Sequence, residues 1–288
     1  MQDCDVVSIY AFVASKTEEY RVMRQYGMFH APFMSFFSQS FYRDVDTHWK
    51  GTGFAYLLLL LTICWIPGII QLHHSVGDYV ENGAPALIEQ LPTITIIKGE
   101  ASVAVAQPYK ITDPDSKMVI ALIDTTGKTV SLEGSEARVL LTRAEVIYKK
   151  SAIETRNFSL KEINAFVLDQ EKVTGWLAIV RKYVAVVAFP FAVVGSFAFR
   201  VAQVLIYAAI GILFARMCKT DRPYQTLLRL SVMAVTPVII VSTVFGMIGI
   251  KIPFHVLVYF LAAMAYLYFA VYAASHQDVG QEKHSMSI

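Results

Sequence analysis

The dominant pattern along the chain is four long apolar runs, with a polar insert of about one hundred residues between the first two. The first run, from Gly51 to Gln71, contains no Asp, Glu, Lys, Arg or His, and comparable runs cover 183–217, 230–250 and 254–274. About twenty apolar residues suffice for a helix to cross the hydrocarbon core of a bilayer. The pattern therefore predicts an α-helical polytopic membrane protein with about four transmembrane helices and a small extracytoplasmic α+β domain inserted between the first and second.

Charge and apolar pattern together divide the chain into segments. Basic residues precede the first run and lie between the second and third, and the positive-inside rule places such clusters in the cytoplasm. The predicted segments are a cytoplasmic tail (1–28), an amphipathic interfacial helix (29–50), the first span (51–73), the extracytoplasmic domain (74–178), a long second span (179–218), a cytoplasmic loop (219–229), the third span (230–250), the fourth span (254–275) and a cytoplasmic tail (276–288).

The second run is longer than one bilayer crossing requires. From Tyr183 to Ala215 it would form about 50 Å of helix at 1.5 Å per residue. Two short spans would put the basic cluster from Arg216 to Arg229 outside, so we favour one long helix, kinked at Pro190, whose first turns stand in the outer interface. The first run is too long and too bulky at its end for a cleaved leader, and we expect an uncleaved span.

The segment before the first span carries an apolar stripe at helical spacing. The stripe comprises Phe33, Phe36, Phe37, Phe41, Val45 and Trp49, with Ser38, Arg43, Asp44 and Asp46 elsewhere on the circumference. Such a helix is typical of the cytoplasmic headgroup layer, and binding to a partner protein is the alternative.

The insert reads as short β-rich runs separated by turns. The expected strands are 93–97, 102–106, 118–123, 137–141, 145–148 and 153–158, forming a sheet flanked by helices. Ser159 and Glu162 have the spacing of a capping box, which predicts a helix that carries Phe166 and leads towards the second span.

Composition and motifs exclude most chemistry. Hydrophobic residues make up 55% of the chain and charged residues 17%, against about 25% in soluble proteins. A net charge of +2 without a long basic run argues against nucleic acid. The run from Ala121 to Gly127 resembles an aspartic-protease loop, but Thr125 and Thr126 together break the motif, and a hairpin turn explains it. We expect no catalytic residue, no metal site and no cofactor.

Three residues inside the apolar runs are candidate intramembrane functional positions. Arg200 is the one charge well inside a run, and it either contacts a substrate or ion or extends its side chain to the outer interface. Thr236 and Pro237 either open the third helix locally, as in some transporters, or are structural.

Several segments resemble an uncharacterised bacterial family of polytopic membrane proteins, the domain of unknown function 1189. They are Phe41–Val45 with Trp49–Gly51, Leu91–Pro92 with Ile97–Glu100, and Arg229–Ser231 with Thr236–Pro237, the last also faintly similar to Yip-type trafficking proteins. Some members carry the label maltodextrin-utilisation protein. The resemblance, over about 29–275, implies a topology but no catalytic residues.

These observations predict a non-enzymatic protein of the bacterial inner membrane, with both termini cytoplasmic and residues 74–178 periplasmic. Its expected role is a scaffold, sensor or accessory protein acting through the outward domain. The alternative is a transporter or transport-associated subunit, with carbohydrate uptake as one substrate class. The expected partners are the lipid bilayer, and beyond it a membrane protein or a second copy of the chain.

Overall fold

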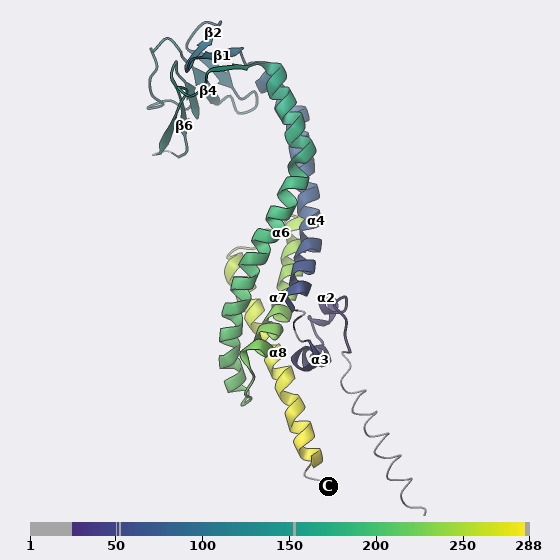
Figure 1. Cartoon of the computed structure of the whole chain (residues 1–288). Helices are drawn as coiled ribbons and strands as arrows, with labels where there is room; N and C mark the ends of the chain where they lie inside the picture. The colour runs from purple at the N-terminus through teal and green to yellow at the C-terminus, as the bar shows by residue number, and fades with distance from the viewer. Residues whose placement is uncertain (1–24, 50, 52, 152–153, 286–288) are drawn as a thin grey trace, which may run out of the picture. The chain divides into compact units, whose positions relative to one another are not determined.

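The computed structural model describes residues 25–49, 51, 53–151 and 154–285, with side chains up to Ser275. The chain divides into two compact units, and we describe each by itself (Figure 1). The helical unit comprises residues 1–69 and 188–288, and the inserted unit comprises residues 70–187. Most of the predicted tail over 1–28 lies outside the described residues.

The described part of the chain contains six α-helices that lie wholly or partly in the helical unit. They are α2 (Ala31–Met34), α3 (Gln39–His48), α4 (Gly53–Asp78), α6 (Gln170–Met217), α7 (Tyr224–Met247) and α8 (His255–Ser285). Helices α4 and α6 contribute residues to both units.

Four of these helices are long and apolar enough to cross a membrane by length and composition: α4 with the turn after it (Gly53–Gly83), α6, α7 and α8 as far as Ser275. The strands lie between the first and second of these helices in the sequence, which is the predicted position of the insert. The second run forms one helix, with Pro190 inside it, and is not divided into two.

The helices extend beyond the predicted spans. Helix α4 continues past residue 73 into a π-helical turn (η1, Tyr79–Gly83), α6 begins at Gln170, α7 begins at Tyr224 inside the predicted loop, and α8 runs to Ser285. An apolar run predicts only the part of a helix that suits lipid. Polar residues with a high helix propensity continue the same helix beyond that run. Asp169 defines the start of α6, because its Oδ1 accepts a hydrogen bond from Lys172 N at 2.9 Å.

The predicted single helix over 29–50 is two helices. Ser38 is extended, and its Oγ accepts from Phe41 N at 3.2 Å, which caps α3 and separates it from α2. The apolar stripe is divided as a result: Phe33 is 71% exposed, whereas Phe41 and Val45 are fully buried in the core of the helical unit. Helix α3 packs against α7 and α8, so it is part of the helical unit and not a separate helix on a surface.

Helix α7 is the centre of the helical unit. It is buried at nearly every position from Thr226 to Ile239. Large side chains from its neighbours close the core around it: Phe41 and Trp49 near the N-terminus, Leu57 of α4 and Leu267 of α8.

The inserted unit contains a short helix, α5 (Pro85–Ile88), and two sheets. The strands are β1 (Ile94–Ile97), β2 (Glu100–Val103), β3 (Tyr109–Thr112), β4 (Val119–Ile123), β5 (Val139–Leu141), β6 (Glu145–Lys149), β7 (Thr155–Ser159) and β8 (Ala165–Leu168). One sheet has the order β2-β1-β8 and is antiparallel; the other has the order β3-β4-β5-β6-β7, with β4 and β5 parallel. Apolar side chains of both sheets, including Ile96 and Ile123, share one core.

Two expectations for the insert are wrong. The single expected sheet is two sheets, and the helix expected after Ser159 does not form there. Residues Ala165–Leu168 instead pair with β1, with Phe166 opposite Ile96. The capping-box signal is local, and strand pairing with a buried partner outweighs it. Strand β3 was not predicted, and the start of the strand expected at Ile153 lies outside the described residues.

Candidate functional site

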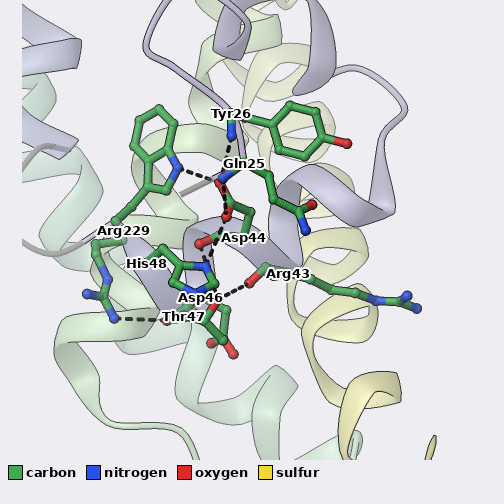
Figure 2. A network of polar contacts seen from close by, with 9 residues as sticks. Gln25, Tyr26, Arg43, Asp44, Asp46, Thr47, His48 and Arg229 are labelled. Atoms are coloured by element: carbon green, nitrogen blue, oxygen red, sulfur yellow. Dashed lines mark hydrogen bonds and ion pairs between the residues drawn. The ribbon is translucent and has the colours of Figure 1, made fainter. Parts of the chain in front are cut away.

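Two carboxylates of α3 are buried at one end of the helical unit. Asp44 is 4% exposed and accepts four contacts: Gln25 N at 3.0 Å, Tyr26 N at 3.2 Å, His48 Nδ1 at 2.9 Å and Trp49 Nε1 at 3.1 Å. Figure 2 shows Gln25, Tyr26 and His48 around the Asp44 carboxylate. Asp44 therefore connects the chain before α2 to the end of α3.

The second carboxylate, Asp46, joins α3 to the connection between α6 and α7. Its Oδ2 lies 3.2 Å from Arg222 Nη1, and the two side chains are 3% and 18% exposed. Arg229 Nη2 donates to the Asp46 carbonyl at 3.2 Å (Figure 2). The same nitrogen donates to Thr226 Oγ1 at 2.7 Å. A buried pair of this kind stabilises only when both members remain, because removing one leaves an uncompensated charge.

Two arginines extend the network to α8. Arg43 Nε donates to the carbonyl of Ala273, and Arg222 Nη2 donates to the carbonyl of Ala274, both at 3.0 Å. Helix α3, the residues just before and at the start of α7, and the later part of α8 therefore lie together at one end of the helical unit, which we call the α3 end.

Tyr42 adds a neutral hydrogen bond at the α3 end. Its hydroxyl donates to the Ser35 carbonyl at 2.6 Å. Burial, with a smaller effect from Tyr266, raises the pKa of the phenol, so the proton needed for this bond stays in place at every ordinary pH. The bond fixes α3 against the residues that separate it from α2.

A polar chain on α6 forms the second candidate site. Arg200 Nη1 donates to Gln203 Oε1 at 2.6 Å, and Gln203 Nε2 donates to the Tyr207 hydroxyl at 2.7 Å. Spacings of three and four residues put all three side chains on one face of the helix. They line a groove of about 790 Å³ between α6, α7 and α8, whose remaining wall is mostly apolar. We call it the Arg200 groove.

Thr236 and Pro237 do not line the Arg200 groove. The wall that α7 supplies consists of Val235 and Val238. Thr236 is fully buried, and its Oγ1 donates to the Val232 carbonyl of its own helix at 3.1 Å. Of the three intramembrane candidates, Arg200 therefore borders this groove, and Thr236 and Pro237 do not.

Asp124 organises a turn in the inserted unit. Its Oδ1 accepts from Thr126 N at 3.0 Å and Thr126 Oγ1 at 2.6 Å, and its Oδ2 accepts from Thr129 N at 2.8 Å. Burial alone would raise the pKa of this carboxyl, but these hydrogen bonds outweigh burial and lower it. The turn leads from β4 into a parallel partner, so it begins a crossover and not the expected hairpin.

Sequence reasoning placed Asp44 and Asp46 on the circumference of the predicted helix outside the apolar stripe, and it did not select Gln203 or Tyr207. Gln203 and Tyr207 follow Arg200 by three and seven positions, and this helical spacing of polar residues could have predicted the chain. The partners of Asp46, and the Gln25 and Tyr26 partners of Asp44, are distant in sequence, and only the fold brings them together. In the described residues no three His, Cys, Asp or Glu side chains form a metal-binding group.

The fold is thus that of a chain with four long apolar helices and a β-sheet insert between the first two. A family model described as "Protein of unknown function (DUF1189)" matches residues 29–271, and the chain belongs to this family. The match covers α2 to α7, the insert and α8 as far as Val271, and it includes the Arg200 groove. Comparison with curated proteins and with solved structures gives no match.

Proposed function

We propose that the chain is an integral protein of the bacterial inner membrane, with four spans, both termini in the cytoplasm and the insert over 74–178 in the periplasm. The α3 end carries this proposal. From Asp46 to Arg222 the chain runs through two long helices, α4 and α6, and returns to the same end. From Arg229 to Ala274 it runs through α7 and α8 and returns again. Four crossings fit these contacts, and five do not.

Charge supports the orientation. Arg43, Arg216, Lys219 and Arg222 lie at or near the α3 end, whereas the connection between α7 and α8 has Lys251 as its one basic residue. Short loops rich in Lys and Arg stay in the cytoplasm. The α3 end is then cytoplasmic, and the insert, which lies between α4 and α6, is on the other side.

The function we propose is that of a non-enzymatic scaffold, sensor or accessory protein that binds a partner through the inserted unit. The unit has its own apolar core and offers an edge strand for pairing. All five residues of β7 are exposed, including Phe158 at 57%, and β7 is the last strand of its sheet. An open edge with an exposed aromatic side chain is a common site for a further strand or partner surface.

Labelling of single cysteines tests the topology. In a background with Cys4, Cys64 and Cys218 replaced by serine, Glu100→Cys should react with a membrane-impermeant maleimide in intact spheroplasts. Lys219→Cys should react only after the membrane is opened. Reaction of Lys219→Cys from outside would overturn the four-span arrangement.

Affinity purification from gently solubilised membranes tests the function. We expect a stoichiometric partner, and Phe158→Asp should reduce its recovery. The matched control is Val130→Asp, since Val130 is 70% exposed and lies outside the strands. A chain recovered alone after cross-linking in intact cells, or equal recovery with Phe158→Asp and Val130→Asp, would contradict binding at β7.

A transporter or transport-associated subunit, with carbohydrate as one substrate class, is a second candidate. The Arg200 groove favours it, because an intramembrane charge beside a cavity often marks a substrate path. The position of Thr236, hydrogen-bonded to its own helix and away from the groove, weakens it. If this function is correct, Arg200→Gln abolishes uptake of the substrate while the protein still inserts.

A further inference from the structure

We propose that the Arg200 groove binds an acidic glycerophospholipid of the outer leaflet, with the lipid phosphate on the Arg200 guanidinium and an acyl chain along the apolar wall. The assignment to the outer leaflet rests on the four-span arrangement proposed above. The chemistry of the ligand does not depend on that arrangement. The proposed function concerns a partner that binds the inserted unit, whereas this inference concerns a lipid that binds the helical unit.

The guanidinium of Arg200 has no counter-charge in the described part of the chain. Its one hydrogen bond there is the bond from Nη1 to Gln203, and the Phe199 ring lies 6.0 Å away. No ion pair joins Arg200 to a described acid. A charge in apolar surroundings is costly unless an anion compensates it. The unused N–H groups of a guanidinium match two oxygens of a phosphate.

The polar chain holds the guanidinium in place. Gln203 accepts from Arg200 and donates in turn to Tyr207, which is 4% exposed and fixed in the core. Because the far end of the chain is immobile, Arg200 loses little side-chain freedom when an anion binds. A site prepared in this way binds more tightly than a free surface arginine.

The walls of the groove suit a hydrocarbon chain. They are formed by apolar side chains of α7 and α8, among them Val235, Val238, Phe260 and Ala263. At about 790 Å³ the space is within the range of ligand sites in proteins. Phe254, Val256 and Leu257 at its border are all more than half exposed, as side chains that face lipid would be.

The depth of Arg200 in the bilayer fits a headgroup. Seventeen residues separate Arg200 from Met217, the last residue of α6, which corresponds to about 25 Å of helix. The hydrocarbon core is about 30 Å thick, so the guanidinium lies near the headgroup level of the leaflet opposite the α3 end. His255, at the start of α8, borders the same groove and adds a polar group at this level.

Lipid selectivity of the whole purified protein tests the proposal. The chain is exchanged into a neutral detergent, and phosphatidylglycerol or phosphatidylcholine with identical acyl chains is added. We expect native mass spectrometry to show one retained phosphatidylglycerol, and the unfolding temperature to rise with phosphatidylglycerol more than with phosphatidylcholine. Equal retention of the two lipids overturns the proposal. Stabilisation by inorganic phosphate alone, equal to that by phosphatidylglycerol, also overturns it in favour of a free anion.

Variants assign the binding to the groove. Arg200→Gln should weaken phosphatidylglycerol binding at least about tenfold, because a charge-assisted hydrogen bond is lost. Arg200→Lys, which keeps the charge but not the paired donors, should give an intermediate affinity. The control is Arg216→Gln, an exposed arginine at the end of the same helix, which should bind as the wild type does. Unchanged binding by Arg200→Gln that elutes as a monodisperse species overturns the assignment.

The selectivity of the wild-type protein is measured without any variant, so a misfolded Arg200→Gln does not leave the proposal undecided. Measurement in detergent is independent of which side of the membrane the insert occupies. Failure of lipid selectivity therefore removes the lipid site alone, whereas labelling of Lys219→Cys from outside removes the topology.

Discussion

The carboxylate of Asp46 lies 3.2 Å from the guanidinium of Arg222, and this ion pair joins the N-terminal helix to the connection between the second and third long helices. Both side chains are largely withdrawn from water, at 3% and 18% exposure. The pair differs in this respect from Arg143 and Glu100 in the inserted unit, which are 67% and 61% exposed. Only the first pair is expected to matter for stability, because exposed pairs contribute about 0–1 kcal/mol.

Replacing Asp46 by asparagine should lower the free energy of unfolding by about 3 kcal/mol. Breaking a buried pair typically costs ~3–5 kcal/mol, and the partial exposure of Arg222 favours the lower end. Denaturant titration in detergent micelles measures the change. The control is Arg216→Gln in the same unit, with an expected change below about 1 kcal/mol. Equal effects of the two variants would show that the pair is not a stabilising contact.

Replacing Asp44 by asparagine should release Trp49 from its buried position. The new amide NH₂ faces several donors, and a buried donor left without an acceptor costs about 1–3 kcal/mol. With Trp65 and Trp176 replaced by phenylalanine, the fluorescence of Trp49 should shift to longer wavelength.

The control for this measurement is Asp221→Asn, since Asp221 is an exposed acid in the same unit. Its variant should leave the emission unchanged. An unshifted spectrum for Asp44→Asn would mean that the indole does not depend on this carboxylate.

Gly99→Ala should destabilise the inserted unit more than Gly127→Ala. Both glycines have positive φ, +81° and +84°, which costs an alanine about 1–2 kcal/mol. At Gly99 a Cβ would also lie 2.8 Å from the Lys161 Cα, whereas Gly127 has open space around it. The difference in melting temperature between the two variants measures the effect of the close approach of Gly99 to the Lys161 backbone. Equal melting temperatures would contradict this close approach.

The stability of the inserted unit should fall in acid. The hydrogen bonds of Asp124 lower its pKa below the unfolded value of about 3.9. The folded state therefore binds fewer protons, and the stabilisation is present above the unfolded pKa and is lost as pH falls through the folded pKa. We expect a drop in unfolding temperature below about pH 4.

Asp124→Asn tests the source of this acid dependence. The variant should reduce the drop without abolishing it, because Ser116 also lowers the pKa of Asp113. An identical pH profile for the variant and the wild type would exclude Asp124 as a source.

The four long helices were predictable because each contains a continuous apolar run long enough to cross a membrane, a pattern that few other structures contain. Most strands were predictable from β-branched residues, as in Val119–Ile123. The capping-box signal at Ser159–Glu162 predicted a helix that does not form, because Phe166 belongs to a strand whose partner, Ile96, is far away in the sequence. Local patterns contain no information about such a partner.

The candidate site was predictable only in part. Arg200 was selected because it is a charged residue inside an apolar run, and the structure places it at the border of a groove. Asp46 has the spacing of the polar side of the helix, whereas Asp44, three residues after Phe41, falls within the apolar stripe; this pattern does not reveal the partners of either acid. Asp46 contacts Arg222 and Arg229, and Asp44 contacts the backbone of Gln25 and Tyr26, groups that a single helix pattern does not reveal.

The network at the α3 end sets an order for biosynthesis. Helix α3 leaves the ribosome before any of the long helices, but Arg222 and Ala273, which hold it, are translated near the end of the chain. Until Arg222 has been translated, Asp46 lacks this partner, and until α8 has been translated, Arg43 lacks the carbonyl of Ala273. Completion of the C-terminal half is thus the event that locks the N-terminal helix into place, and a nascent chain stalled before Arg222 carries that helix unsecured.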